Sequence, residues 1–290
     1  MKKILVPTDF SPSSLKALDF AVQIAKCSKG EIILIHACTE MLDTEAQSNR
    51  SMYTAYNEAR SDKARAQLSM IKESIENAEQ VMVTTKVYEG SVEETILQVT
   101  EDTHADLTVM GTLGNTGMNE TLFGSVSASI IGKTTVPLLI IPPLSEWEIP
   151  KKLLLVVNHF KTEEENTAAV FQLAQLFNAS VYIGFFTEDY SDESELTLDQ
   201  EQTILNYRQT LETKYPRISI RAFHIGGHLF KETIEDYIEQ KSIDMVAMVT
   251  YKRTFLQGLF HPSMTKKMSY SSHIPLLAIP ARSTAVSGTK

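Results

Sequence analysis

The chain carries one pattern twice, and this internal duplication restricts its fold more than any other feature. The opening run Lys2–Asp9 resembles Lys151–Asn158, at an offset of 149 residues. Pro137–Pro142 resembles Pro275–Pro280, at an offset of 138 residues, so the second copy is 11 residues shorter in its middle. A chain of 290 residues is long enough for two domains. The duplication therefore predicts two domains of one fold.

The two copies join at a proline-rich stretch, residues 142–150. Proline resists the interiors of helices and of central strands, because it lacks the backbone N–H group. We therefore expect one domain over residues 1–143, a second over residues 151–282 and a disordered tail at residues 283–290.

Each copy alternates apolar, strand-like runs with helical patterns. In the first copy the strand-like runs lie near residues 3–8, 31–37, 81–88, 106–111 and 137–141. They are rich in Val, Ile and Leu without polar alternation, which is typical of parallel strands covered on both faces. The alternation predicts a doubly wound α/β domain, in which ligands bind beyond the carboxyl ends of the strands, where the strand order reverses.

The helical patterns also carry capping signals. The first helix has candidate N-caps at Ser11 and Ser13 and a proline, Pro12, in its first turn. Its expected apolar face consists of Leu15, Leu18, Ala21, Val22 and Ala25. Good helix formers fill residues 44–79, and a further helix is expected after residues 90–91.

The composition argues against several classes of function. The formal net charge of −9 disfavours a surface for nucleic acids or anionic membranes. Two cysteines, Cys27 and Cys38, provide no thiolate metal cluster and fit a reducing compartment. The first apolar run stops at Asp9, too early for the core of a signal peptide, and no apolar run is long enough to span a bilayer. We therefore expect a cytoplasmic protein without nucleic-acid or membrane partners.

A glycine-rich loop follows the fourth strand-like run of the first copy. It contains Gly111 and Gly114, and nine residues separate Gly114 from Gly124, which precedes Ser125 and a helical pattern. Glycines let backbone N–H groups approach an anion closely, and a serine at a helix start offers both its amide and its hydroxyl. The pattern indicates a phosphate-binding loop, and a flexible surface loop is the alternative.

Asp9 follows the first strand, and two roles are open to it. It either caps the next helix or binds the hydroxyls or an exocyclic amine of a ligand. If the first and fourth strands flank the reversal point, the Asp9 and Gly111 loops face one crevice, which favours the ligand role. His36 is expected to be packed, and Ser125 has no evident His/Asp partner at triad spacing. No catalytic residue and no protein metal cage is assigned.

Three motifs of the first copy together resemble the universal stress protein family in its tandem form. They are Pro7-Thr8-Asp9, His36-Ala37 and the spacing Gly111-x2-Gly114-x9-Gly124-Ser125. The resemblance covers nearly the whole chain, and the glycine spacing matches the nucleotide-binding signature of the family's ATP-binding branch. It implies a strand order of 3-2-1-4-5 in Rossmann-like domains and an adenine nucleotide (ATP, ADP or AMP) in the crevice of the first domain.

The resemblance also implies roles for individual residues around the nucleoside. Asp9 would serve the adenosine moiety, and the backbone around Ala37 would contact adenine. Gly111 and Gly114 would line the ribose and the phosphates.

The phosphates would be held farther along the same loop. The Ser125 hydroxyl and the backbone amides of Gly124, Ser125 and Val126 would bind them, and Mg²⁺ would sit on the phosphates. The implied cofactor-binding set is Pro7, Thr8, Asp9, Ala37, Met110, Gly111, Gly114, Gly124, Ser125 and Val126.

The second copy departs from this pattern. The residues equivalent to Asp9, Gly111, Gly114, Gly124 and Ser125 are Asn158, Val249, Lys252, Pro262 and Ser263. Three side chains would occupy the space of the phosphates, and Pro262 has no amide donor. We expect the second domain to keep the fold and to lack this site.

The sequence therefore predicts a nucleotide-dependent regulatory module of a stress response, with one ATP site. No general base or arginine finger is readable near the phosphates, so any hydrolysis is expected to be slow and enzymatic activity is left open. A slow ATPase or phosphotransferase using the same loop, and a scaffold with a vestigial site, are the alternatives. The resemblance further implies that the last strands of the two copies pair within the chain. Residues 41–79 are the candidate surface of a homo-oligomer.

Overall fold

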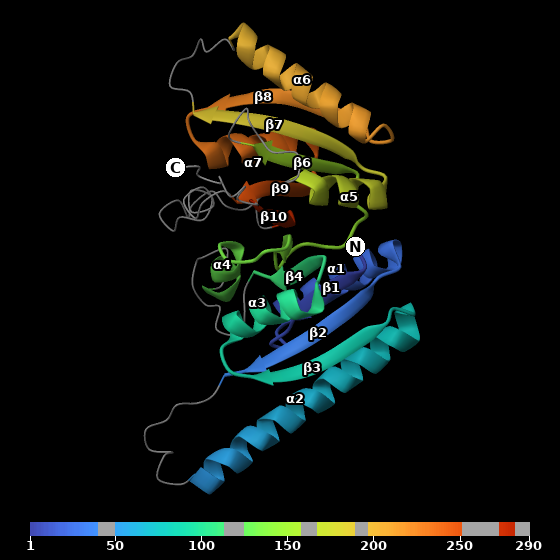
Figure 1. Ribbon diagram of the computed structural model, residues 1–290, viewed down its shortest axis with the longest axis vertical. Coiled ribbons are helices and arrows are strands. Elements are labelled where there is room, and N and C mark those ends of the chain that lie inside the picture. Colours follow the sequence, from blue (N-terminus) through green and yellow to red (C-terminus); the bar gives the residue numbers. More distant parts are fainter. Residues whose placement is uncertain (40–49, 113–124, 158–166, 189–196, 251–272, 282–290) are drawn as a thin grey trace, which may run out of the picture. The chain divides into compact units, whose positions relative to one another are not determined.

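The computed structural model describes residues 1–39, 50–112, 125–157, 167–188, 197–250 and 273–281 (Figure 1). The chain divides into two compact units, Met1–Trp147 and Glu148–Lys290. The duplication seen in the sequence is therefore a duplication of a folded unit, and the tandem form is confirmed.

The first unit alternates strands and helices along the chain. Its elements are β1 (Lys3–Pro7), α1 (Pro12–Ser28), β2 (Glu31–Cys38), α2 (Arg50–Glu79), β3 (Val83–Glu89), α3 (Val92–Thr103), β4 (Leu107–Gly111), α4 (Ser125–Ile131) and β5 (Leu138–Ile141). The five strands are parallel and lie in the order β3-β2-β1-β4-β5, which confirms the expected order.

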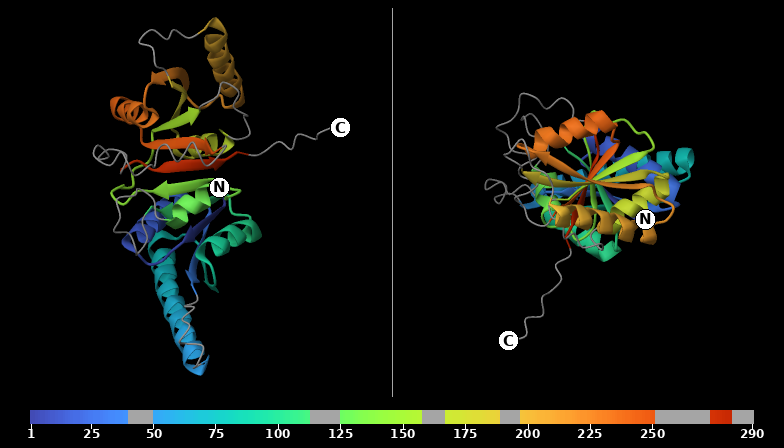
Figure 2. Two further views of the ribbon diagram at one scale, coloured as in Figure 1. Left: turned by 90° about the vertical axis from the view of Figure 1, so that its left-hand side faces the viewer. Right: turned by 90° about the horizontal axis from the view of Figure 1, so that it is seen from above.

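Helices cover both faces of this sheet (Figures 1 and 2). α1 contacts α2 as well as β1 and β4, whereas α3 contacts α4 together with β1 and β2. Both faces of the central strands are thus removed from water, which explains their continuous apolar sequences. In β1, the side chains of Ile4, Leu5 and Val6 are fully buried.

The second unit repeats this architecture. Its elements are β6 (Lys152–Val157), α5 (Ala168–Phe177), β7 (Ser180–Glu188), α6 (Leu198–Lys214), β8 (Ile220–Gly227), α7 (Phe230–Lys241), β9 (Met245–Thr250) and β10 (Leu276–Pro280). The strands are parallel and lie in the order β8-β7-β6-β9-β10, equivalent to that of the first unit. In the described parts of both units, no helix is long and apolar enough to cross a membrane.

Helix α1 begins where its sequence predicts. Ser11 is the N-cap, its Oγ accepts a hydrogen bond from the Ser14 amide (3.2 Å), and Pro12 occupies the first turn. The expected apolar face was wrong at one position. Leu15 is 36% exposed, whereas Ala17 and Phe20 are buried. The face of α1 that packs against β4 and β1 therefore includes Ala17 and Phe20 and leaves Leu15 at its margin.

Two helices of each unit end in the same way. α1 stops at Lys29 and α5 at the equivalent Asn178, with φ of 51° and 53°. α3 stops at His104 and α7 at the equivalent Ser242, with φ of 52° and 50°. A residue in the left-handed conformation ends a helix because its amide donates a hydrogen bond to a carbonyl of the last turn. This conformation costs backbone free energy for any residue other than glycine. Both copies keep this backbone turn although its side chains differ.

Candidate functional site

The strand order reverses between β1 and β4. β1 pairs with β2 on one side and with β4 on the other, where Ile4 lies opposite Leu107. Because all strands are parallel, the carboxyl ends of β1 and β4 open at the same edge. The loop that follows Pro7 and the end of β4 at Gly111 therefore lie at the same edge of the sheet.

The loop after β1 is held by its own hydroxyl and carboxylate groups. Asp9 Oδ1 accepts a hydrogen bond from the Ser11 amide (3.0 Å), and Thr8 Oγ1 accepts one from the Phe10 amide (3.0 Å). Thr8 Oγ1 also lies 3.0 Å from Ser14 Oγ. Asp9 is not the helix cap, since Ser11 fills that position. Its carboxylate instead shapes the turn that follows β1.

Phe10 holds an uncommon backbone conformation beside this turn. Its φ of 62° lies in the left-handed region, which costs a residue with a Cβ about 1–2 kcal/mol. The ring of Phe10 lies 4.7 Å from the ring of His36, centroid to centroid. Aromatic packing across the loop offsets part of this cost.

His36 connects the second strand to the same loop. Its Nδ1 lies 2.7 Å from the Thr8 carbonyl oxygen, and since a carbonyl only accepts, Nδ1 carries the proton of that bond. Thr8 is bonded to β2 a second time, because its amide donates to the Ile35 carbonyl (2.8 Å). His36 thus packs from β2 against the loop, and the half-buried Ala37 follows it near the carboxyl end of β2.

Gly111 lies directly against the start of α1. A Cβ placed on Gly111 would be 2.3 Å from Ser13 Oγ and 2.6 Å from the Ser13 carbonyl oxygen. Non-bonded atoms do not approach a Cβ atom this closely, so any side chain at position 111 would displace the start of α1. Helix packing therefore requires a glycine here. The predicted role of Gly111 beside the ribose and phosphates remains a prediction.

The start of α4 is bonded to the end of β4. Ser127 Oγ donates to the Gly111 carbonyl (2.9 Å), and the Thr112 amide donates to the Ile141 carbonyl (3.2 Å). Sequence reasoning did not find Ser127, although its place two residues after Ser125 puts it in the first turn of the helix.

The remaining predicted site residues lie along the same segment. Met110 is buried in β4, and Val126 is half-buried in α4. Gly114 and Gly124 lie outside the described residues.

The second unit differs at the equivalent edge. Val249, which replaces Gly111, is buried in β9. Asn158, Lys252, Pro262 and Ser263 lie outside the described residues. Across the described parts of the chain, no group of three or more His, Cys, Asp and Glu side chains is arranged to hold a metal ion.

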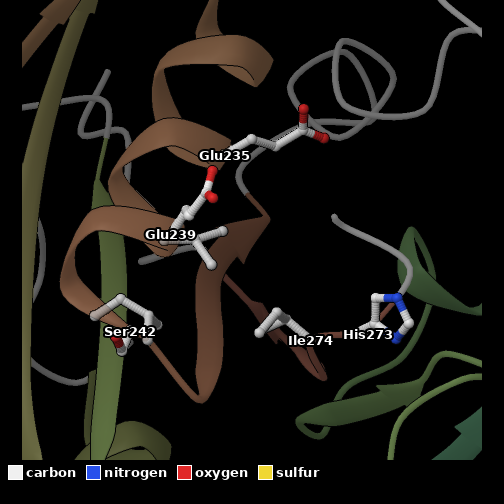
Figure 3. A pocket seen from close by; sticks show the side chains of 7 residues that line it. Glu235, Glu239, Ser242, His273 and Ile274 are labelled. Carbon is white, nitrogen blue, oxygen red and sulfur yellow. The ribbon is translucent and has the colours of Figure 1, made fainter. Parts of the chain in front are cut away.

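A pocket of about 200 Å³ is present in the second unit, away from the crevice edge of its sheet (Figure 3). It is lined by Glu235, Ile238, Glu239, Ser242, Ile243, His273 and Ile274. In Figure 3 the two glutamates project from α7, while His273 and Ile274 precede β10. The equivalent surface in the first unit is that of α3, which packs against α4. We do not assign a nucleotide to this pocket.

One family of proteins matches both units. The sequence model described as the universal stress protein family matches residues 1–142 and 150–280. Single-unit relatives match about half of the chain. Universal stress protein MJ0577 of Methanocaldococcus jannaschii is 30% identical over 153 residues, which cover 48% of this chain and 94% of that protein. Universal stress protein YxiE of Bacillus subtilis is 30% identical over 144 residues, which cover 48% and 97%.

A solved structure matches the full length. The universal stress protein from Archaeoglobus fulgidus DSM 4304 superposes with a TM-score of 0.72 and covers 96% of this chain and 98% of that chain. At 16% identity the likeness concerns the fold alone. It agrees with two α/β units in one chain.

Proposed function

The chain belongs to the universal stress protein family, and on that premise we propose that its first unit binds one adenine nucleotide and that its second unit binds none at the equivalent place. The nucleotide is ATP, ADP or AMP, and Mg²⁺ is carried by the phosphates rather than by a protein cage. The proposal describes a cytoplasmic regulatory module whose nucleotide occupancy changes its association with partners during stress.

The observation that carries the proposal is the edge shared by β1 and β4. The Asp9 turn and Gly111 stand at the carboxyl ends of two neighbouring strands, where the strand order reverses. Doubly wound sheets bind nucleotides at such a reversal point. The glycine spacing that begins at Gly111 supports an anion at the same edge.

The groups at this edge suit a nucleoside. Asp9 is half-buried and is oriented by the Ser11 amide. A carboxylate accepts hydrogen bonds at about four lone-pair sites, and a ligand hydroxyl or amine is a suitable donor to it. The backbone near Ala37, at the carboxyl end of β2, would contact the base. Ser125 and Val126 open α4 and would offer amides to a phosphate.

Binding, rather than turnover, is the proposed activity. Phosphoryl transfer needs a residue that positions the attacking nucleophile and a cation that stabilises the charge of the transition state. The site residues proposed here are glycines, hydroxyls, backbone amides and one carboxylate that is bonded within its own turn. A slow ATPase remains the second candidate. Measuring phosphate release with Mg²⁺ and ATP separates the two, because sustained turnover abolished by Gly124→Pro would favour the enzyme.

The direct test is chemical analysis of the purified protein. Small molecules released by denaturation are identified by mass spectrometry, and stripped protein is titrated with ATP, ADP and AMP by calorimetry. We expect an adenine nucleotide to be released or to bind. Failure of all three nucleotides to bind would leave the alternative of a scaffold with a vestigial site.

A further inference from the structure

One carboxylate from α3 holds the end of α4. Glu93 lies in the first turn of α3, and its Oε2 accepts a hydrogen bond from Ser129 Oγ (2.5 Å). The other oxygen, Oε1, forms an ion pair with Lys133 Nζ. Ser129 lies in α4, and Lys133 lies in the turn that follows its last residue, Ile131. Both oxygens of Glu93 are therefore engaged by the α4 region.

The other end of α4 is fixed to the sheet. The buried Ser127 donates to the Gly111 carbonyl (2.9 Å), which joins the first turn of the helix to the last residue of β4. Gly111 and Ser125 are the two described ends of the glycine-rich loop. Contacts outside the loop thus fix where the loop leaves the sheet and where it enters α4.

The second unit has lost the groups that make the Glu93 bridge. At the offset of 138 residues, Glu93 is replaced by Lys231 and Ser129 by Lys267. Lys231 Nζ lies 3.8 Å from Glu235 Oε1 within α7, so the position has changed from an acceptor to a cation with a partner in its own helix. The copy that replaced the loop glycines has therefore also replaced the bridge.

We propose that Glu93 is a positioning residue of the nucleotide site. It holds α4 so that the residues at the start of the helix are already in place for the phosphates, and it does not touch the nucleotide. This inference rests on the proposed function of the first unit. A binding group that is immobile before the ligand arrives loses less entropy on binding, so the bridge raises affinity without adding a contact.

The bridge itself is only a modest source of stability. The side chains of Glu93 and Lys133 are 28% and 42% exposed, and ion pairs exposed to this degree contribute little to folding. Its main consequence is the position of α4. Loss of nucleotide affinity can therefore be separated from loss of the fold.

The test exchanges the charges of the bridge. Glu93→Lys reproduces the residue of the second unit and places two cations together. We expect it to weaken ATP binding about tenfold in calorimetry. We also expect faster hydrogen exchange of the amides in residues 125–134 when no nucleotide is present. Adding Lys133→Glu restores the opposite charges and should restore both affinity and protection. A role in folding alone would lower the thermal-unfolding midpoint together with the affinity, whereas the positioning role lowers the affinity of protein that remains folded.

The matched control is Glu94→Lys. Glu94 is the exposed neighbour in the same helical turn, so this variant changes the net charge and the helix-terminal charge equally. It should bind ATP within about twofold of the wild type. Unchanged affinity in Glu93→Lys, or restored protection without restored affinity in the double variant, would overturn the positioning role. If the wild type binds no nucleotide, the proposed function fails, and with it the positioning role. The exchange data then still decide whether Glu93 fixes α4.

Discussion

Asp244 holds in the second unit the position of Asp106 in the first, and the two carboxylates receive the same hydrogen bonds. Asp106 Oδ2 accepts from the Lys3 amide (3.0 Å) and Asp244 Oδ2 from the Lys152 amide (2.9 Å). Asp106 Oδ2 also accepts a hydrogen bond from the Lys2 amide, and Asp244 Oδ2 also accepts one from the Lys151 amide. The residue before β4 or β9 thereby fixes the start of the central strand of its unit.

The same substitution should accordingly have the same effect in both units. Asp106→Ala and Asp244→Ala each remove the acceptor of two backbone amides at a partly exposed strand start, which should destabilise the respective unit by about 1–2 kcal/mol. Urea denaturation followed by circular dichroism measures the change. Asp102→Ala, at an exposed position of α3, is the control and should change stability by less than about 0.5 kcal/mol. A large effect in only one unit would contradict the equivalence.

Gly111→Ala should destabilise the first unit by about 1–3 kcal/mol, because the new Cβ would overlap Ser13. Ser13→Ala removes the hydroxyl and leaves the Ser13 carbonyl, which would lie 2.6 Å from that Cβ. The double variant should therefore remain destabilised. Thermal unfolding of the two single variants and the double variant checks this. Full recovery of stability in the double variant would mean that only the Ser13 side chain, and not the Ser13 backbone, excludes a Cβ at position 111.

Stoichiometry is the next prediction. The phosphate loop is intact in the first copy and changed at Val249, Lys252 and Pro262 in the second. Calorimetry should therefore give one adenine nucleotide per chain. Two equivalent sites per chain would show that the second unit binds through other groups.

Gly124→Pro should give the first loop the proline of the second. It removes one amide donor and adds bulk where we propose the phosphates bind. A hydrogen bond to a charged group is worth about 1.5–3 kcal/mol, so affinity for ATP should fall roughly tenfold or more. Pro262→Gly is the counterpart in the second unit, and by itself it should not create a site. An unchanged affinity in folded Gly124→Pro protein would reduce Gly124 to a turn residue.

The last strands of the two units should pair antiparallel within one chain. β5 and β10 each end the strand order of their own unit, and exposed apolar edges are usually covered. With Cys27 and Cys38 replaced, Leu139→Cys can be combined with a cysteine at each position of β10 in turn. Oxidation should cross-link one register within the chain. Absence of an intramolecular cross-link at every position would refute the pairing. Deleting part of residues 41–79 tests self-association separately, through the oligomer mass.

Local signals in the sequence were sufficient for the elements and for the helix start. Apolar runs located the strands to within about two residues, since the central parallel strands are buried on both faces. Ser11 was found because its hydroxyl serves an amide three residues away. The strand order came from the family resemblance and could not be obtained from periodicity, which carries no information on which strands are neighbours.

The contacts that build the site escaped the sequence because they join distant positions. Ser13 and Gly111 are 98 residues apart, and Glu93 and Ser129 are 36 residues apart. At Gly111, close helix packing and close anion approach both select glycine, so the sequence alone could not reveal the packing role. Leu15 fitted the apolar face by its spacing, but the direction from which the sheet covers α1 depends on tertiary packing.

The end of β4 at Gly111 packs so closely against Ser13 of α1 that no space remains for a side chain between them. We expect a shift of β4 on ligand binding to be passed to α1 at this point of close packing. The exposed Cys27 lies in the last turn of α1, and Cys38 is buried. A thiol-reactive fluorescent dye attached to Cys27 would therefore report movements of α1 that accompany ligand binding at the carboxyl ends of β1 and β4.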